Sequence, residues 1–483
     1  MDPTRVLVDR LTERDALRAL LDRPGPQLAL VTGRRRVGKT YLLDRTWPPE
    51  NTFHYTATRT TPEQNRRQLL IDLAAWCDES LDPADYPSWR SVFDLLWRTK
   101  PAQPLVVVID EFQYLATSVT GLAEVASALN ATLERSRTER RLVIVLSGSS
   151  VSTLAGLASG GAPLYGRLAL HLKLAPLRPY DIGAFVPAWN ARERAAGFGV
   201  LGGTPAYWAL VDPTLGLRPN LAELVLAPTG RVRLQLETVL DQEEGLGDTA
   251  AYRGVVRAIA SGATTRSRIA DATGLKLDQS LVRRLAQLVE LGVVDEVPNY
   301  QAARNAPIRY RVSDPAIRFF EALVVPNTSL LERVEPLQAY DTLVAPRLNG
   351  FMGHAFERMV EPTFERLRAS RGLPTVRIWS RWEGTDRDRR GLEIDIVAPL
   401  SEGGVMTGSV KWNRRPLGPE GFFDHLAALR RGADAGHRWA HEAKDGPMLF
   451  VSAAGFDARF RTVAEAYPNQ VIAWSLEDLY SPG

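Results

Sequence analysis

The sequence predicts an α/β protein that begins with a three-layer core built on a parallel sheet. Short apolar runs typical of buried strands alternate with segments of helical spacing up to residue 150. A glycine-rich loop follows the first of these strands, and two adjacent acids follow the third. Because the binding site of such a sheet forms at the carboxyl ends of its strands, we expect the loop and the acids to meet.

The glycine-rich loop is Gly33–Thr40, which has the pattern G-x-x-x-x-G-K-[ST] between an apolar strand at 27–32 and a helical pattern. Its backbone N–H groups can curl around a polyphosphate, and the helix N-terminus adds a positive dipole. Lys39 would reach the β- and γ-phosphates, and the Thr40 hydroxyl would hold Mg²⁺. The predicted nucleotide-binding residues of this segment are Gly33, Arg34, Arg35, Arg36, Val37, Gly38, Lys39, Thr40 and Tyr41.

The two acids, Asp110 and Glu111, follow the apolar strand at 105–109. Adjacent carboxylates at the end of a buried strand are costly unless they meet a cation or a reacting water. We expect Asp110 to hold Mg²⁺ with Thr40, and Glu111 to polarise the attacking water. The alternative is a strand followed by an acidic helix cap. No Asn-Lys-x-Asp signature for guanine is present, so the sequence favours hydrolysis of ATP.

A fourth strand, at 142–146, ends in a cluster of serines, Ser147 to Ser150. At the carboxyl end of the sheet, Ser149 or Ser147 would face the γ-phosphate as a polar sensor. A serine cluster that only caps the next helix is the alternative.

The remaining patterns divide the chain into further domains. A P-loop core is predicted at 1–175, a helical lid at 176–248 and a winged helix-turn-helix at 249–325. A proline-bearing linker is expected at 326–345, and a second α/β domain at 346–483. The winged helix is modestly basic, which is compatible with DNA contact; such modules also serve as intramolecular lids or dimer surfaces.

The last domain carries a second group of charged residues. Glu393 and Asp395 lie two residues apart on a predicted strand and therefore share a face, while Lys411 lies on the next strand. With Glu357 on a preceding helix, this order is that of a nuclease-type metal site. Glu357 and Asp395 would hold the divalent ion, and Lys411 would steady a phosphate or hydroxide. A solvent-facing sheet edge with ordinary charges is the alternative.

Together these motifs resemble the archaeal-type ATPase family of the STAND/AAA+ group, which has a C-terminal PD-(D/E)XK-like (DUF234-type) domain with a restriction-endonuclease-like fold. The resemblance also uses Gly166-Arg167 and the Gly-Gly-Thr-Pro run that ends at Pro205. It implies that Pro205 and Arg10 lie near the adenine. It also implies that Arg167 senses the γ-phosphate, within the chain or from a neighbouring subunit. Otherwise Arg167 is a surface arginine, and Pro205 a proline that starts a helix.

One position departs from that resemblance. Nuclease members have an acid two residues before the lysine, where this chain has Ser409. A carboxylate about 4 Å from a cation gains roughly 4 kcal/mol at an effective dielectric of 20, so its loss weakens metal binding. The expected function is therefore a Mg²⁺-dependent ATPase switch coupled to DNA binding or partner recognition. The alternative is an ATP-gated, metal-dependent DNA nuclease.

Composition limits the setting. The chain has 483 residues, a formal charge of +3 and one cysteine, so an internal disulfide is excluded. No run of eighteen apolar residues and no apolar signal core is present, so we expect a cytoplasmic protein without a membrane partner. ATP or ADP is the expected ligand, and a nucleotide-dependent homo-oligomer is left open.

Overall fold

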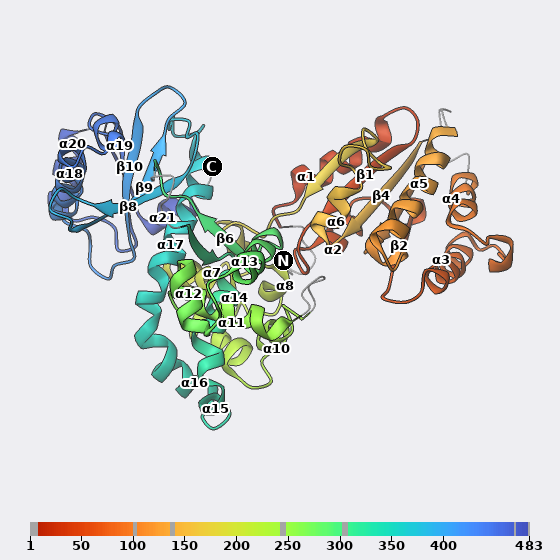
Figure 1. Ribbon diagram of the computed structural model, residues 1–483, viewed down its shortest axis with the longest axis horizontal. Coiled ribbons are helices and arrows are strands. Elements are labelled where there is room, and N and C mark those ends of the chain that lie inside the picture. The colour runs from red at the N-terminus through yellow and green to blue at the C-terminus, as the bar shows by residue number, and fades with distance from the viewer. Residues whose placement is uncertain are drawn as a thin grey trace. The chain divides into compact units, whose positions relative to one another are not determined.

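The computed structural model describes residues 8–99, 104–135, 141–241, 248–301, 308–467 and 470–481. The chain divides into two compact units. The first consists of Met1–Leu177 with Thr204–Ala206, and the second of Arg178–Gly203 with Tyr207–Gly483 (Figure 1). In the described part of the chain, no helix combines the length and the apolar character that crossing a membrane requires.

The first unit contains a five-stranded parallel sheet of order β2-β3-β4-β1-β5. Its strands are β1 (Gln27–Thr32), β2 (Thr52–Thr56), β3 (Leu105–Asp110), β4 (Leu142–Gly148) and β5 (Leu168–Lys173). The predicted parallel α/β core is confirmed, with β1, β3 and β4 at the apolar runs and β2 at the segment 52–56 that was also predicted as a strand. The sequence did not indicate β5, because this edge strand is half-buried and has no continuous apolar run.

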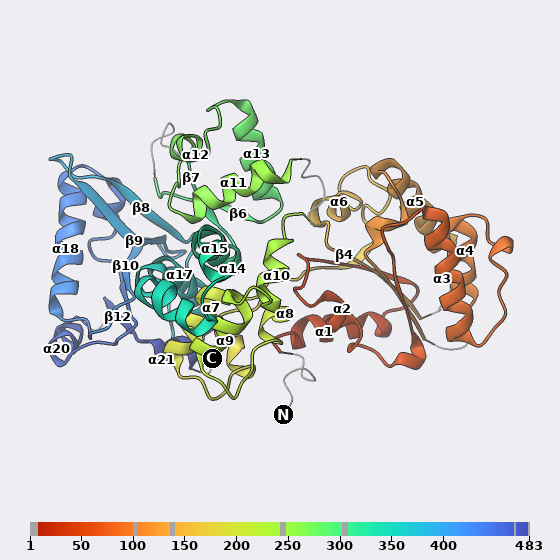
Figure 2. The same cartoon turned by 90° about the horizontal axis from the view of Figure 1, so that it is seen from below.

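Helices cover both faces of this sheet and make it a three-layer core (Figure 2). Alternate residues of a strand point to opposite faces, so Leu28 and Leu30 of β1 enter one core, and Ala29 and Val31 the other. The first core also contains α3 (Pro62–Cys77), α4 (Trp89–Arg98), α5 (Val119–Arg135) and α6 (Val151–Gly156). The second contains α1 (Leu11–Arg18) and α2 (Lys39–Leu43), which follows the glycine-rich loop directly.

The second unit begins with short helices and then a three-helix module. The short helices are α7 (Ala191–Leu201), α8 (Pro205–Trp208, which starts in the first unit), α9 (Leu217–Leu221) and α10 (Arg231–Glu237). The module consists of α11 (Thr249–Ala260), α12 (Arg266–Thr273), α13 (Gln279–Glu290), β6 (Val294–Val297) and β7 (Arg309–Val312). The strands β6 and β7 pair in antiparallel register.

The segment 326–345, expected to be a linker, is mostly helical. The helix α14 (Pro315–Phe319) lies before this segment. A 3-10 turn that begins at Val325 is followed by α15 (Thr328–Leu331), α16 (Pro336–Ala339) and a π turn at Tyr340–Val344. Prolines in and directly after this segment suggested a linker. In the structure, however, Pro336 and Pro346 occupy the first or second position of a helix. The N–H that proline lacks has no partner inside the helix at those positions.

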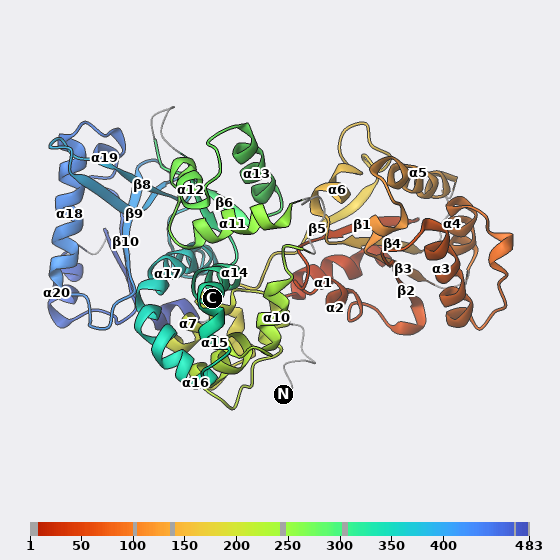
Figure 3. The same cartoon turned by 60° about the horizontal axis from the view of Figure 1, so that its bottom comes forward.

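The last domain is a second, separate α/β layer structure, as predicted (Figure 3). The helix α17 (Ala345–Leu367) precedes a sheet of order β12-β11-β10-β9-β8. Its strands are β8 (Ser380–Thr385), β9 (Gly391–Pro399), β10 (Val405–Lys411), β11 (Met448–Ser452) and β12 (Val471–Trp474). The helices that follow β10 are α18 (Pro419–Asp434), α19 (Arg438–Glu442), α20 (Ala458–Ala466) and α21 (Leu476–Tyr480).

The helix α7 is tied to this last domain. The Arg192 guanidinium lies 4.5 Å from the centre of the Trp412 ring and donates to the carbonyl oxygen of Asn413 at 2.8 Å. Partly exposed cation–π contacts of this kind stabilise by about 0.5–1 kcal/mol. The segment predicted as a lid therefore shares a unit with the C-terminal sheet rather than with the P-loop core.

Candidate functional site

The glycine-rich loop leaves β1 at the carboxyl edge of the first sheet, and its glycines are required there. A Cβ on Gly33 would lie 2.7 Å from the carbonyl oxygen of Leu174, so no larger residue fits. Gly38 has φ +93°, a left-handed conformation that side chains disfavour, and directly precedes α2. The loop is thus a tight backbone turn that leads directly into the N-terminus of a helix, the kind of segment at which anions bind.

Lys39 and Thr40 connect this loop with the end of β3. The Lys39 ammonium is buried, with 5% of the residue exposed, and donates to the carbonyl oxygens of Gly33 at 2.9 Å and Arg34 at 3.2 Å. The Thr40 hydroxyl donates to Asp110 Oδ2 at 2.5 Å. A buried ammonium, a hydroxyl and a buried carboxylate thus converge at one edge, which is the donor set that a magnesium–triphosphate complex requires.

Glu111 adopts a left-handed conformation with φ +51° immediately after β3. Its Oε2 accepts hydrogen bonds from the Ser149 hydroxyl at 2.8 Å and from the Ser149 amide at 3.3 Å. Positive φ costs about 1 kcal/mol or more for a non-glycine residue and is common at functional sites. The Glu111 carboxylate is therefore held in a defined position, and Ser149, expected as a γ-phosphate sensor, is one of the groups that hold it.

Gln113 was missed by sequence reasoning. Its Nε2 donates to Glu111 Oε2 at 2.5 Å and lies 3.3 Å from the Ser149 hydroxyl. A Cβ on Gly148 would lie 2.2 Å from Gln113 Oε1, so the glycine at the end of β4 makes room for this side chain. The only signal in the sequence was a polar residue inside an otherwise apolar turn after the two acids.

Two buried polar atoms near this edge support the fit of a polar ligand. Among the described residues, the Ser147 hydroxyl and Gln113 Oε1 are buried without a hydrogen-bond partner. Ser147 pairs in register with Val31, one residue before the end of β1. Buried polar atoms are rarely left unsatisfied, so groups at this position are prepared for water or a bound polar molecule.

Tyr114 was not predicted either, and it links two arginines to the same edge. Its hydroxyl accepts from Arg35 at 2.6 Å and from Arg59 at 2.9 Å. Arg35 belongs to the glycine-rich loop, whereas Tyr114 follows the acids of β3 by three residues. The phenol therefore fixes one arginine of the loop relative to β3.

Arg10 and Pro205 lie at the same edge of the sheet as the glycine-rich loop. Arg10 is buried and donates to the carbonyl oxygen of Ala175 at 2.5 Å, just beyond the carboxyl end of β5. Within the first unit, Pro205 Cγ lies 3.9 Å from the position that a Cβ on Gly38 would take. Pro205 thus lies beside the glycine-rich loop and Arg10 near the end of β5, the strand next to β1, while their place beside the adenine stays a prediction.

Arg167 lies at the opposite edge of the sheet. It precedes β5, whose first residue pairs with Leu28 near the start of β1, whereas the loop follows the end of β1. Its guanidinium forms an exposed ion pair with Glu134 of α5. A strand of six residues spans about 16–20 Å, so Arg167 does not reach the loop of its own chain.

In the last domain, Asp395 and Lys411 contact each other. Asp395 Oδ2 accepts from the Val410 amide at 2.8 Å, from the Lys411 ammonium at 3.1 Å and from the Ser409 hydroxyl at 3.3 Å. These side chains line a hollow of about 380 Å³. One oxygen of the carboxylate therefore accepts three hydrogen bonds from the protein itself, and the Ser409 hydroxyl lies where the nuclease pattern has an acid.

Glu357, the third member of the predicted nuclease-like set, lines a different cavity. That cavity measures about 360 Å³ and also takes in Glu393, Arg318 and Arg358. In the part of the chain that the structure describes, no group of three or more His, Cys, Asp or Glu side chains is arranged to hold a metal ion. The structure brings Asp395 to Lys411 and Glu393 to the rim of both hollows, but it does not bring Glu357 to Asp395.

Comparison with known proteins gives one family match. Residues 320–418 match the family model DUF234, described as "Archaea bacterial proteins of unknown function". An uncharacterized protein of Methanocaldococcus jannaschii is 24% identical over 401 residues, which are 81% of this chain and 84% of the relative. The matched family segment runs from the π turn after α14 to the start of α18.

The chain is also partly similar to solved structures, two of which are named as ATPases. A Walker-type ATPase of Pyrococcus abyssi has a TM-score of 0.48 at 21% identity, over 65% of this chain and 96% of the other. The ORC2 protein of Aeropyrum pernix, solved as ADPNP–ADP complexes, has a TM-score of 0.47 at 16% identity, over 70% and 96%. A STAND protein of Pyrococcus horikoshii has a TM-score of 0.32 at 12% identity, over 76% and 50%.

The strand order β2-β3-β4-β1-β5, with the loop after β1 and the acids after β3, is itself the arrangement of a P-loop ATPase core. The chain consists of this core, the helices that follow it, and a C-terminal α/β domain, and it carries the DUF234 domain at residues 320–418.

Proposed function

We propose that the protein is a Mg²⁺-dependent ATPase that acts as a nucleotide-driven switch. The observation that carries this proposal is the convergence of Lys39, Thr40 and Asp110 at the carboxyl edge of the first sheet. Bound Mg²⁺–ATP would supply the γ-phosphate as the group to be attacked by water. The loop amides and Lys39 would hold the phosphates, while Thr40 and Asp110 would hold the metal.

Glu111 is the residue that would orient the attacking water. Its left-handed backbone and the hydrogen bonds from Ser149 and Gln113 fix the carboxylate at the end of β3. A fixed carboxylate can accept a proton from water without first reorganising its surroundings. Pro205 and Arg10 would border the base, because Pro205 lies beside the loop and Arg10 near the end of β5.

Chain connectivity supports a switch. Thr204–Ala206 belongs to the first unit, while the residues on either side of it belong to the second. A displacement of Pro205 on nucleotide binding would therefore be passed along the chain to α7. Arg192 of α7 is in turn joined to the C-terminal sheet through Trp412 and Asn413. The DUF234-bearing domain would be the element that responds.

We propose that this C-terminal domain, although PD-(D/E)XK-like, recognises DNA or a partner protein without cleaving it. Asp395 already accepts three hydrogen bonds from its own chain, and Glu357 lies in a separate cavity. A metal would have to displace Lys411 from Asp395, at a cost of at least one charge-assisted hydrogen bond. The ATP-gated nuclease is therefore the less supported alternative.

The winged helix proposed for α11 to β7 would offer DNA its helices rather than its wing. Asn299, after β6, exchanges two 2.9 Å hydrogen bonds with the backbone of Glu383 in β8. The beginning of the wing is therefore joined to the C-terminal sheet, whereas Arg283 on α13 is exposed. DNA contact through α13 would be a backbone contact, with the salt dependence that phosphate contacts give.

Phosphate release from ATP tests the ATPase proposal. The purified full-length chain with Mg²⁺ should release phosphate, and Glu111→Gln should lower the rate by about a hundredfold or more while ATP binding persists. Glu124→Gln, an exposed residue of α5, is the matched control and should keep the normal rate. Equal rates for the normal chain and Glu111→Gln would remove the assignment.

A cleavage assay separates the two roles of the C-terminal domain. Plasmid and linear DNA are incubated with Mg²⁺ or Mn²⁺, with and without ATP. The non-cleaving proposal predicts intact DNA under all conditions. Cleavage that Lys411→Ala abolishes would contradict it and establish the nuclease alternative.

A further inference from the structure

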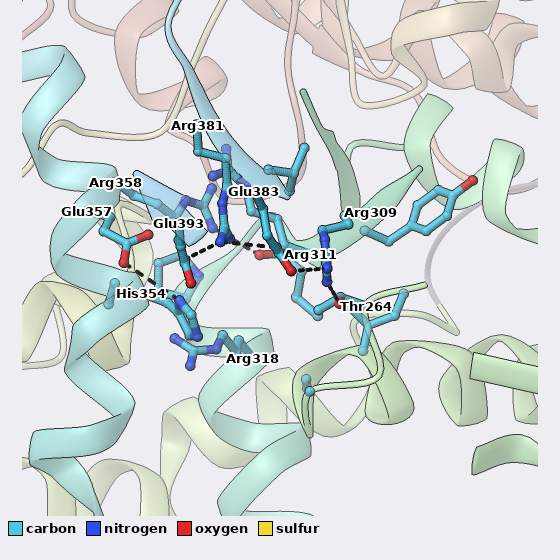
Figure 4. A pocket seen from close by; sticks show the side chains of 18 residues that line it. Thr264, Arg309, Arg311, Arg318, His354, Glu357, Arg358, Arg381, Glu383 and Glu393 are labelled. Atoms are coloured by element: carbon cyan, nitrogen blue, oxygen red, sulfur yellow. Dashed lines mark hydrogen bonds and ion pairs between the residues drawn. The ribbon is translucent and has the colours of Figure 1, made fainter. Parts of the chain in front are cut away.

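A cavity of about 360 Å³ lies where the three-helix module meets the C-terminal domain, inside the second unit (Figure 4). The helix α17 supplies His354, Glu357 and Arg358 to its wall, and β8 and β9 supply Arg381, Glu383 and Glu393. The remaining wall comes from the end of α11 and the turn after it, from β6 and β7, and from α14. The cavity has no part in the proposed ATPase site, and of its charged residues only Glu357 and Glu393 were predicted as site residues from the sequence.

The wall of the cavity has an excess of positive charge. Three glutamates face five arginines, which are Arg309, Arg311, Arg318, Arg358 and Arg381. On one side the charges are already compensated. Glu383 receives ion pairs from Arg309 and Arg381, and Arg381 also pairs with Glu393. Because Glu383 and Glu393 face each other across β8 and β9, Arg381 is needed there to offset their repulsion.

On the other side, Arg318 has no such compensation. Among the described residues, no carboxylate lies within 4.0 Å of its guanidinium. It lies 4.0 Å from the centre of the Phe351 ring and donates to the Phe351 carbonyl oxygen at 3.2 Å. Burial lowers the pKa of Arg318 to about 10, and the charge of Glu357 opposes this shift. The side chain is therefore a partly buried cation that forms no direct ion pair with a carboxylate of the described residues, although the charge of Glu357 acts on it.

Arg358 is in a similar position. It shares a single carboxylate, that of Asp295, with Arg311, at distances of 3.5 Å and 3.2 Å. Burial lowers the pKa of Arg358 to about 10; Arg311 and Arg318 add to this shift, while the carboxylates of Asp295 and Asp314 oppose it. Arg318 and Arg358 thus both belong to the cavity wall, and together with Arg311 they have fewer directly paired carboxylates than guanidinium groups. Partly buried cations gain stability when an anion joins them.

We propose that this cavity binds a terminal phosphate group, which Arg318 and Arg358 hold. Guanidinium groups match phosphate oxygens with paired hydrogen bonds, which an ammonium does not. A volume of about 360 Å³ is at the small end of ligand pockets and suits a molecule of mononucleotide size or less. The proposal is independent of ATP hydrolysis at the first unit.

A terminal phosphate could come from a free small molecule or from the end of a nucleic acid strand, and three probes distinguish these sources. They are inorganic phosphate, 5′-AMP, and a short single-stranded oligonucleotide with a 5′-phosphate, compared with its 5′-hydroxyl form. Calorimetry uses the full-length Lys39→Ala chain, so that the P-loop contributes little. Binding of phosphate or 5′-AMP indicates a free ligand. Binding of the 5′-phosphorylated strand alone indicates a strand end.

Arg318→Gln should weaken binding of the responsive probe by about tenfold to a hundredfold, because a hydrogen bond to a charged group is lost. Arg318→Lys should give an intermediate affinity, since it keeps the charge but not the fork. The matched control is Arg438→Gln on α19, whose side chain is 82% exposed and outside the cavity. The control should bind like the unchanged chain.

The substitution Glu357→Gln should change the affinity for the phosphate probe in the opposite direction. It removes a negative charge from the cavity wall and should tighten anion binding by roughly fivefold. Should Arg318→Gln fail to fold, this variant decides by itself. The proposal is overturned if none of the three probes binds, or if Arg318→Gln binds as well as the control. Equal or weaker affinity of Glu357→Gln would also contradict it.

Discussion

The Thr40 hydroxyl donates a 2.5 Å hydrogen bond to Asp110 Oδ2, although 70 positions separate the two residues. This contact joins the glycine-rich loop after β1 to the carboxyl end of β3. The strand β4 lies between β3 and β1 and pairs with both, and this order brings the ends of β3 and β1 close enough for the contact. The contact therefore depends on the strand order of the whole core, and it predicts how the metal is held.

Asp110→Asn should remove the benefit of Mg²⁺ for nucleotide binding. In the proposed site Asp110 acts on the metal through its water shell, and outer-shell groups change metal affinity by about tenfold to a hundredfold. The ATP affinity measured with Mg²⁺ should therefore fall by that factor, while the affinity in EDTA should not change. Asp85→Asn, at an exposed turn, is the control. Equal losses with and without Mg²⁺ would indicate a folding defect instead.

Gly148→Ala should lower the rate of ATP hydrolysis more than it changes ATP affinity. The new Cβ would lie 2.2 Å from Gln113 Oε1 and 2.6 Å from Leu154 Cδ1, so Gln113 must move away from Glu111. Gly156→Ala is a matched control, because its Cβ would meet nothing within 4 Å. Steady-state kinetics should give a reduced kcat for the first variant and normal values for the second. A raised KM with an unchanged kcat would contradict a role of Gln113 in positioning Glu111.

Arg167→Ala should leave ATP binding by a single chain unchanged, because Arg167 lies at the far edge of the sheet from the loop. Its exposed ion pair with Glu134 contributes about 0–1 kcal/mol, so the fold should persist. If neighbouring subunits supply this arginine, ATPase activity per molecule rises with protein concentration, and Arg167→Ala removes that rise. Activity that is independent of concentration in both proteins would exclude the role in a neighbouring site.

The stability of the last domain should fall as the pH decreases from about 6.5 to about 4. Burial lowers the pKa of His425 from 6.5 to about 4; Asp395 opposes this shift, and Lys411 adds to it. The folded imidazole stays neutral over that range while the unfolded one takes up a proton, so the unfolded state is favoured at lower pH. The loss is on the order of 3 kcal/mol.

His425→Gln should remove this part of the pH dependence. Glutamine can still reach the Thr407 hydroxyl, which lies 2.9 Å from His425 Nε2, but it does not titrate. Urea unfolding of the full chain near pH 7 and near pH 5 compares the two proteins. An identical decrease in both would assign the effect to other groups.

Sequence reasoning predicted the elements that local pattern determines. Continuous apolar runs located β1, β3 and β4, residues 52–56 were also predicted as a strand, and the sequence GRRRVGKT located the loop before α2. The edge strands β5 and β12 were not recognised, because each is short and partly exposed. Element boundaries in the helix-rich segment at 326–345 were obscured by prolines that begin helices rather than end them.

The contacts of the candidate site could be predicted only in part. The order of Asp110 and Glu111 after a strand was enough to expect them near Thr40. The interaction of Gln113 with Ser149 and Glu111 depends on the space that Gly148 leaves, which no spacing rule reveals. The position of Glu357 on a helix before the strands also matches the order of a nuclease site. The rotation of α17 about its axis, which the order does not reveal, directs Glu357 into the cavity with Arg318 instead.

The pairing of Asn299 with Glu383 has a practical consequence for truncated forms of the protein. The strand β8 is at the edge of its sheet, with β9 on one side, and residues 299 and 300 cover the other side through hydrogen bonds to Arg381 and Glu383. A fragment starting after residue 308 would expose that edge, which carries unpaired backbone donors and acceptors. Such fragments should self-associate, and a soluble C-terminal piece needs to begin before α11.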